Sequence, residues 1–106
     1  MTAIGKKAFK NYKKLTTVTI GENVKSIGDE AFMKCVKLKK ITFGKNVKTI
    51  GKKAFYGDKK LKSMVFKGGK VTKVGKKALK GVSGVKVKVP NNKAKEKYVK
   101  LLKKAQ

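Results

Sequence analysis

A six-residue segment recurs along the chain at a nearly constant interval. "IGKKAF" at residues 4–9 is followed by "IGDEAF" at 27–32, "IGKKAF" at 50–55 and the weaker "VGKKAL" at 74–79. The interval between these start positions is constant except for a single insertion before the last segment. A period of this length is typical of solenoids, in which each repeat forms one coil and neighbouring coils stack. We therefore expect about four 23-residue repeats that begin at these segments.

The second half of each repeat carries a strand pattern. "LTTVTI" at 15–20, "LKKITF" at 38–43 and "LKSMVF" at 61–66 share it, and it weakens to "VKVKV" at 85–89. Apolar and polar residues alternate, which predicts a short strand with one buried face. Strands one repeat apart must run parallel, so we expect a parallel sheet along one side of the solenoid. By the same reasoning, we expect a second ladder of shorter segments around 24–27, 47–50 and 71–74.

Stacked coils would bury two files of large apolar side chains, because no single repeat can bury its own apolar face. One file is Phe9, Phe32, Phe55 and Leu79, and the other is Ile20, Phe43, Phe66 and Val89. A glycine recurs at 5, 28, 51 and 75, which predicts either a positive φ or a close approach of backbones.

These motifs carry a family resemblance. L-x-x-V-x-I-x-x-N (Leu15 to Asn23) and L-x-x-I-x-F-x-x-N (Leu38 to Asn46) match the leucine-rich repeat signature. With the added I-G-x-x-A-F half, the chain resembles the BspA-like (Treponema-type) branch of leucine-rich repeats over about residues 4–90. The resemblance implies an α/β solenoid, a right-handed coil with a parallel sheet. It also implies a non-enzymatic binding module of a bacterial surface protein.

One column departs from that family, which often has Cys or Asn a few residues after the phenylalanine. Here the column is Tyr12, Cys35, Asp58 and Val82, so we expect any side-chain ladder in it to be broken. Asn23 and Asn46 are expected to bond turn backbone in their own coils.

The last residues change period. Ala94, Tyr98, Leu101 (with Leu102) and Ala105 fall on one face of a helix. Pro90 and the pair Asn91 and Asn92 supply a start signal. We expect a repeat array over residues 1–90 and a capping helix over residues 91–106 that covers the last coil. The N-terminus has no such cap, so either the chain is the C-terminal part of a longer protein or this edge pairs with a second copy.

The net charge of the chain limits the classes of macromolecule that it is expected to bind. The chain has 31 basic residues, all lysine, against 5 acidic ones, a net charge of +26. Such a surface attracts polyanions without a shaped site. The absence of arginine argues against specific base readout, because bidentate recognition of guanine or phosphate favours arginine. A solvated lysine face without any function stays an alternative.

The residue types in the sequence give little support for an enzymatic active site. The chain has no histidine and one cysteine, Cys35, so His-based catalysis, an internal disulfide and a zinc site are excluded. Cys35 is expected to be a buried, inert thiol. Asp29 and Glu30 are the only adjacent carboxylates, at a position we expect to face solvent. The "GKK" segments do not match a phosphate-binding loop. We expect no enzymatic activity, cofactor, metal or membrane-spanning segment.

The favoured function is macromolecule binding through the outward side of the parallel sheet, with an acidic protein or an anionic glycan or cell-wall polymer as partner. The candidate residues are Thr17, Thr19, Lys40, Thr42, Ser63, Val65, Lys86 and Lys88. By the resemblance, we expect an extracellular or cell-surface location and a role in adhesion. Two alternatives stay open: a spacer held to anionic wall polymer by its lysines, and non-specific nucleic-acid binding.

Overall fold

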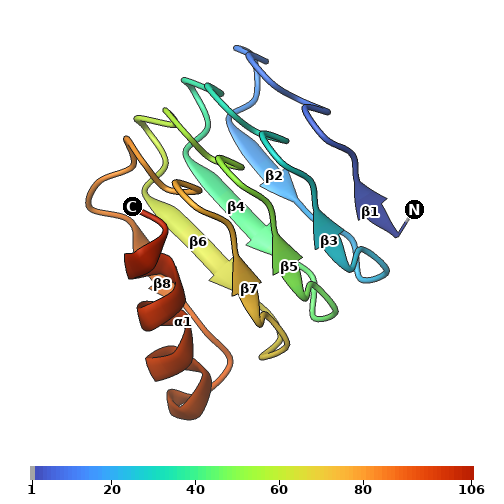
Figure 1. The fold of residues 1–106 in the computed structure, drawn as a ribbon, viewed down its shortest axis with the longest axis vertical. Coiled ribbons are helices and arrows are strands. Elements are labelled where there is room, and N and C mark those ends of the chain that lie inside the picture. The colour runs from blue at the N-terminus through green and yellow to red at the C-terminus, as the bar shows by residue number, and fades with distance from the viewer. Residues whose placement is uncertain (1) are drawn as a thin grey trace.

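The computed structural model describes residues 2–106, apart from the side chain of Asn92, and forms a solenoid of four coils. Two four-stranded parallel sheets line its two sides (Figure 1). The short sheet has the order β1-β3-β5-β7, with strands Ala3–Ile4, Ser26–Ile27, Thr49–Ile50 and Lys73–Val74. The long sheet has the order β2-β4-β6-β8, with strands Thr17–Thr19, Lys40–Phe43, Ser63–Phe66 and Lys86–Lys88.

The register of both sheets follows the sequence period. Ile27 pairs with Ile50, its equivalent in the next repeat, and Ile50 pairs with Val74 one coil further on. The insertion before the last repeat is taken up in the turn between β6 and β7, because the long sheet still pairs Phe43 with Phe66 at the regular interval. The predicted solenoid, with its parallel sheet and second ladder, is confirmed.

Aromatic side chains stack from coil to coil inside the solenoid. The ring of Phe32 lies 5.3 Å from that of Phe9 and 5.5 Å from that of Phe55, nearly parallel to both. In the second file, the rings of Phe43 and Phe66 lie 4.5 Å apart. Both predicted files therefore form, and the central rings are fully buried.

The recurring glycine has one of its two predicted roles. A Cβ added to Gly28, Gly51 or Gly75 would lie 2.6, 2.5 or 2.3 Å from a backbone nitrogen of the preceding coil. The glycine is thus required for close stacking. The positive φ occurs instead two residues later, for example at Glu30 (58°) and Lys77 (61°). The reason is the tight turn, in which the third residue, not the first, adopts the left-handed conformation.

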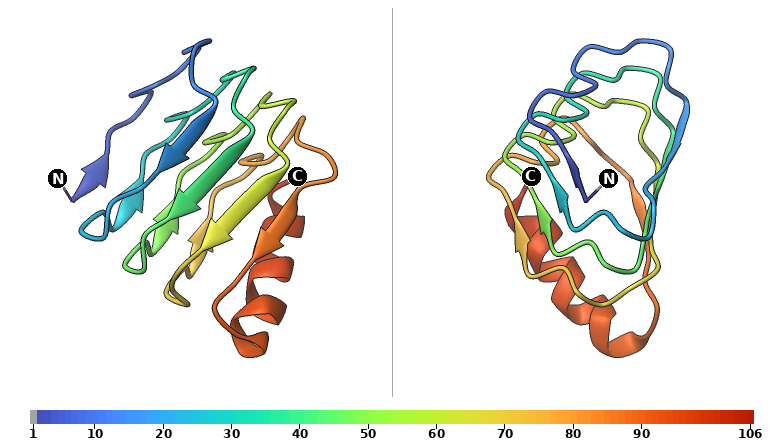
Figure 2. Two further views of the ribbon diagram at one scale, coloured as in Figure 1. Left: turned by 180° about the vertical axis from the view of Figure 1, so that it is seen from behind. Right: turned by 90° about the vertical axis from the view of Figure 1, so that its right-hand side faces the viewer.

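Helix α1, Asn92–Lys104, covers the last coil (Figure 2). The Asn91 side chain caps it by accepting a hydrogen bond from the N–H of Ala94 at 2.8 Å. Its buried face is largely the predicted one: Ala94, Tyr98, Leu102 and Ala105 are buried, while Leu101 is half-buried and packs at the edge of the core. The sequence also predicts that Asn92 contributes to the helix start signal, but the side chain of Asn92 lies outside the described residues. The capping helix is confirmed.

The expectation of a broken side-chain ladder after the phenylalanines is wrong for the second and third coils. The thiol of Cys35 donates to the carbonyl oxygen of Phe9 at 3.2 Å, and the backbone N–H of Cys35 donates to Oδ1 of Asp58 at 2.8 Å. A carboxylate and a thiol can each meet the backbone of the adjacent coil, so the ladder does not need identical residues. Asn46 also bonds between coils, to the carbonyl oxygen of Glu22 at 2.8 Å, and not within its own turn.

Candidate binding surfaces

The outward side of the long sheet carries the predicted partner-binding residues. Parallel pairing places them in two files, one residue per strand: Thr17, Lys40, Ser63 and Lys86 in the first, and Thr19, Thr42, Val65 and Lys88 in the second. We call these eight residues the outer stripe. Their side chains face outward because the residues between them, such as Ile41 and Met64, are fully buried.

The outer stripe combines hydroxyl groups with positive charge. Its end strands are the most exposed: Thr17, Thr19, Lys86 and Lys88 are all exposed, while Ser63 and Val65 in β6 are half-buried. None of its eight residues is acidic. The outer stripe is therefore electrostatically complementary to an acidic partner.

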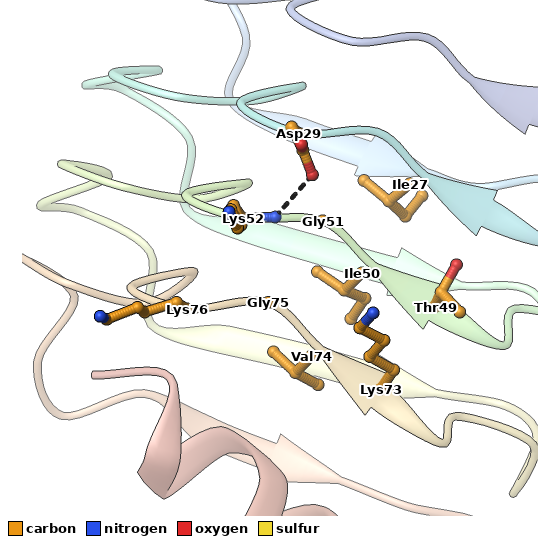
Figure 3. Close-up of a pocket in the computed structure, with 10 residues that line it drawn as sticks. All are labelled: Ile27, Asp29, Thr49, Ile50, Gly51, Lys52, Lys73, Val74, Gly75 and Lys76. Carbon is orange, nitrogen blue, oxygen red and sulfur yellow. Dashed lines mark hydrogen bonds between the residues drawn. The ribbon is translucent and has the colours of Figure 1, made fainter.

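A groove on the short-sheet side was not predicted from the sequence (Figure 3). It has a volume of about 440 Å³ and is lined by residues of three successive coils: Ile27, Asp29, Thr49, Ile50, Gly51, Lys52, Lys73, Val74, Gly75 and Lys76. A second hollow of about 290 Å³ adjoins it and shares Asp29, Lys52 and Lys76. We call the two together the lysine groove.

The equivalent positions in the four coils explain the groove. Lys6, Asp29, Lys52 and Lys76 follow the recurring glycine directly. Oδ1 of Asp29 accepts a hydrogen bond from the backbone N–H of Lys52 at 2.8 Å, in the next coil. The signal in the sequence is the single acidic residue in this otherwise basic column, but the column pattern predicts only a solvent-facing position. Asp29 is indeed exposed, but it also has this backbone partner.

The neighbouring carboxylate is held by a lysine. Oε1 of Glu30 lies 2.9 Å from Nζ of Lys10, and this hydrogen bond is the main reason that the pKa of Glu30 is lowered. Within residues 2–106 it is the one salt bridge of the fold. The lysines of the outer stripe and of the lysine groove therefore have no carboxylate partner inside the described chain.

Two buried ionisable groups lie away from both surfaces. Burial raises the pKa of the Asp58 carboxyl from 3.8 to about 8, against the opposing effect of the hydrogen bond from Cys35. Burial also raises the pKa of the Cys35 thiol to about 11, and the Asp58 charge adds to the effect. The predicted burial of Cys35 is confirmed, and its raised pKa makes the thiol a poor nucleophile at neutral pH.

The described residues hold no cluster suited to a metal ion: residues 2–106 contain no group of three or more Cys, Asp or Glu side chains in ligand geometry. Over the same range, no helix has the length and apolar character needed to cross a membrane.

Four stacked coils of nearly equal length, two parallel sheets and a terminal helix define a leucine-rich-repeat solenoid. Comparison with protein families agrees, because the model described as "BspA type Leucine rich repeat region (6 copies)" matches residues 1–98. The chain belongs to this BspA-type leucine-rich repeat family. Proteins of this kind generally serve as non-enzymatic interaction modules and are typically associated with bacterial surfaces.

A solved structure is also similar. A leucine-rich repeat protein from Bacteroides ovatus superposes with a TM-score of 0.72 at 33% sequence identity, over 84% of this chain. The match covers 25% of that protein, so the chain corresponds to about a quarter of its length. A comparison with curated proteins gave no match.

Proposed function

We propose that the chain is a non-enzymatic binding module that holds an acidic macromolecule, a protein or an anionic wall glycan, on its outer stripe. The observation that carries this proposal is the register of the long sheet. It aligns three lysines, three threonines and a serine on one face without a carboxylate among them. A rigid sheet loses little conformational entropy when it binds, so even modest contacts can add up to useful affinity.

Location and role are part of the same proposal. Family membership supports an extracellular or cell-surface protein of a bacterium, and a role in adhesion or protein interaction follows from such a location. The chain would then be one segment of a larger surface protein, as the partial coverage of the Bacteroides ovatus protein suggests.

Charge reversal at the outer stripe tests this function. We would replace Lys40, Lys86 and Lys88 by glutamate together and measure retention on purified cell wall and on acidic extracellular proteins at physiological salt. The matched control makes the same replacement at Lys37, Lys59 and Lys60, which are exposed in the turns that precede β4 and β6 within their coils. Both triple variants lower the net charge equally. We expect the stripe variant to lose retention and the control to keep it.

A spacer that adheres to wall polymer through its charge alone is the competing function, favoured by the net charge of +26. It predicts that both triple variants lose retention to the same degree, and that random DNA is retained as well as cell wall at low salt. Either result would overturn binding through the outer stripe, because diffuse attraction depends on the number of charges and not on their position.

A further inference from the structure

The contact between Asp29 and Lys52 shows that this fold can bind a carboxylate at one defined backbone position. The N–H of Lys52 directly follows Gly51, at the start of the tight turn, and donates to Oδ1 of Asp29 at 2.8 Å. The carboxylate belongs to a residue of the preceding coil (Figure 3). Asp29 therefore occupies the position that the carboxylate of an external ligand could take at an equivalent N–H. A backbone N–H donating to a carboxylate is a charge-assisted hydrogen bond, stronger than a neutral one.

One coil further on, the equivalent backbone N–H, that of Lys76, has no carboxylate partner in the described part of the chain. Lys76 occupies the position of Lys52, but the residue equivalent to Asp29 is now Lys52 itself, which has no acceptor to offer. Among residues 2–106, the N–H of Lys76 makes no hydrogen bond to backbone or side chain. Gly75 and Lys76 line the lysine groove, so the unpaired donor is at its wall.

The charges around this donor favour an anion. The lysine groove is lined by Lys6, Lys52, Lys53, Lys73, Lys76 and Lys77, against two carboxylates. Both carboxylates already have partners, since Asp29 accepts from the Lys52 N–H and Glu30 is paired with Lys10. A ligand that brings a negative charge would therefore meet several lysines that no group of the described chain neutralises.

We propose that the lysine groove binds an acidic peptide segment, one carboxylate of which accepts the hydrogen bond of the Lys76 N–H. The occupant is a carboxylate because the chain's own Asp29 shows that this group fits the equivalent site one coil earlier. A peptide is favoured over a simple anion because the half-buried Val74 also lines the groove and can contact the methylene groups of glutamate. The site is separate from the outer stripe and does not depend on it.

The variant Lys52→Asp tests the site by placing a carboxylate of the chain itself where the peptide carboxylate is proposed to bind. The new carboxylate would occupy the place that Asp29 has one coil earlier and accept the Lys76 N–H. The matched control is Lys60→Asp, which makes the same change of charge at an exposed turn outside both the lysine groove and the outer stripe. Binding of a fluorescein-labelled hexaglutamate peptide would be measured by anisotropy at physiological salt, after circular dichroism has shown both variants to be folded.

We expect Lys52→Asp to weaken peptide binding about tenfold, because the peptide loses one charge-assisted hydrogen bond and meets a negative charge in place of a positive one. Lys60→Asp should weaken it less than about threefold, as an exposed surface charge does. Equal weakening by the two variants would overturn the site, because it would mean that only total charge matters.

Amide resonances give a second, independent readout. In a titration with the peptide, the Lys76 N–H signal should shift downfield, while the Lys52 N–H, already bonded to Asp29, should shift little. In Asp29→Ala, the Lys52 signal should begin to respond to the peptide as well. A peptide that binds without moving the Lys76 signal would overturn the proposal. So would inorganic polyphosphate that moves this signal where the peptide does not, since the occupant would then be a phosphate polymer.

The outcome is distinguishable from that of the proposed function. Variants of Lys40, Lys86 and Lys88 test the outer stripe and leave every residue of the lysine groove unchanged. If those variants keep their partner while Lys52→Asp loses the peptide, the groove stands and the outer stripe does not.

Discussion

The backbone N–H of Cys35 donates a hydrogen bond to Oδ1 of Asp58, in the next coil, at a distance of 2.8 Å inside the solenoid. Asp58 is completely buried, and within the described residues its other oxygen, Oδ2, has no hydrogen-bond partner. An ionised carboxylate in this place would be costly, because a buried charge needs several partners. The arrangement therefore favours the protonated acid.

The variant Asp58→Asn should change how stability depends on pH. The pKa of Asp58 is raised from 3.8 to about 8, so the folded state retains a proton that the unfolded state loses between these values. Stability therefore falls as the pH rises through this window, by at most about 1.4 kcal/mol per pH unit. Asparagine keeps the oxygen that accepts from Cys35 but does not titrate, so this slope should disappear.

Urea unfolding of both proteins at about pH 5 and about pH 8 measures the difference. The chain has no histidine, so no other side chain with an ordinary pKa titrates midway through this range. Parallel pH profiles for the two proteins would show that Asp58 is ionised in the folded state.

Phe32→Ala should be strongly destabilising. The Phe32 ring is buried between those of Phe9 and Phe55, and its loss leaves a cavity that a stiff stack of coils cannot close. We expect a loss of about 3–5 kcal/mol in the free energy of unfolding. Phe9→Ala is the matched control, because Phe9 is half-buried and has a ring neighbour from only one adjacent coil. Chemical denaturation that ranks the two variants equally would contradict the stacking argument.

Tyr98→Phe tests how the helix is fastened to the last coil. The Tyr98 hydroxyl donates to the carbonyl oxygen of Gly68 at 2.7 Å and accepts from the N–H of Val71 at 3.1 Å. Removing it leaves two backbone groups without this partner, at a cost of about 1–3 kcal/mol. Val99→Ala, on the exposed side of the same helix, should change stability by less than about 0.5 kcal/mol. The melting temperatures of the two variants provide the comparison.

Gly75→Ala and Gly5→Ala make the same change at equivalent positions with different surroundings. A Cβ at Gly75 would lie 2.3 Å from the backbone nitrogen of Lys52, whereas a Cβ at Gly5 would meet nothing within 4 Å. We expect Gly75→Ala to cost about 1–3 kcal/mol through forced separation of the coils. Gly5→Ala should be nearly neutral. Similar unfolding midpoints would mean that the glycine serves another purpose.

Much of the architecture could be predicted from the chain because it repeats. The apolar patterns around Ile27 and around Ile41 each predict one strand. Because both patterns recur in the next repeat in the same chain direction, equivalent strands must pair in parallel. The phenylalanine files follow from the same period. The terminal helix was predictable because the spacing of Ala94, Tyr98 and Ala105 differs from that of the coils and is purely local.

The candidate sites were less accessible to this reasoning. The outer stripe could be placed, since alternation decides which strand residues face outward. The lysine groove could not, because its donor is a backbone N–H that any residue except proline possesses. Whether the N–H of Lys76 is satisfied depends on what side chain the preceding coil presents to it.

By itself, then, the amino-acid sequence determined the number of coils, the two sheets, the buried files and the closing helix, since each of these is a periodic property of side-chain polarity. Only the tertiary structure decided the contacts between unlike residues at equivalent positions of adjacent coils: Cys35 with Asp58, and Asp29 with the N–H of Lys52. Those contacts depend on distances between stacked backbones, and a repeat pattern specifies which positions meet without specifying how their atoms are satisfied.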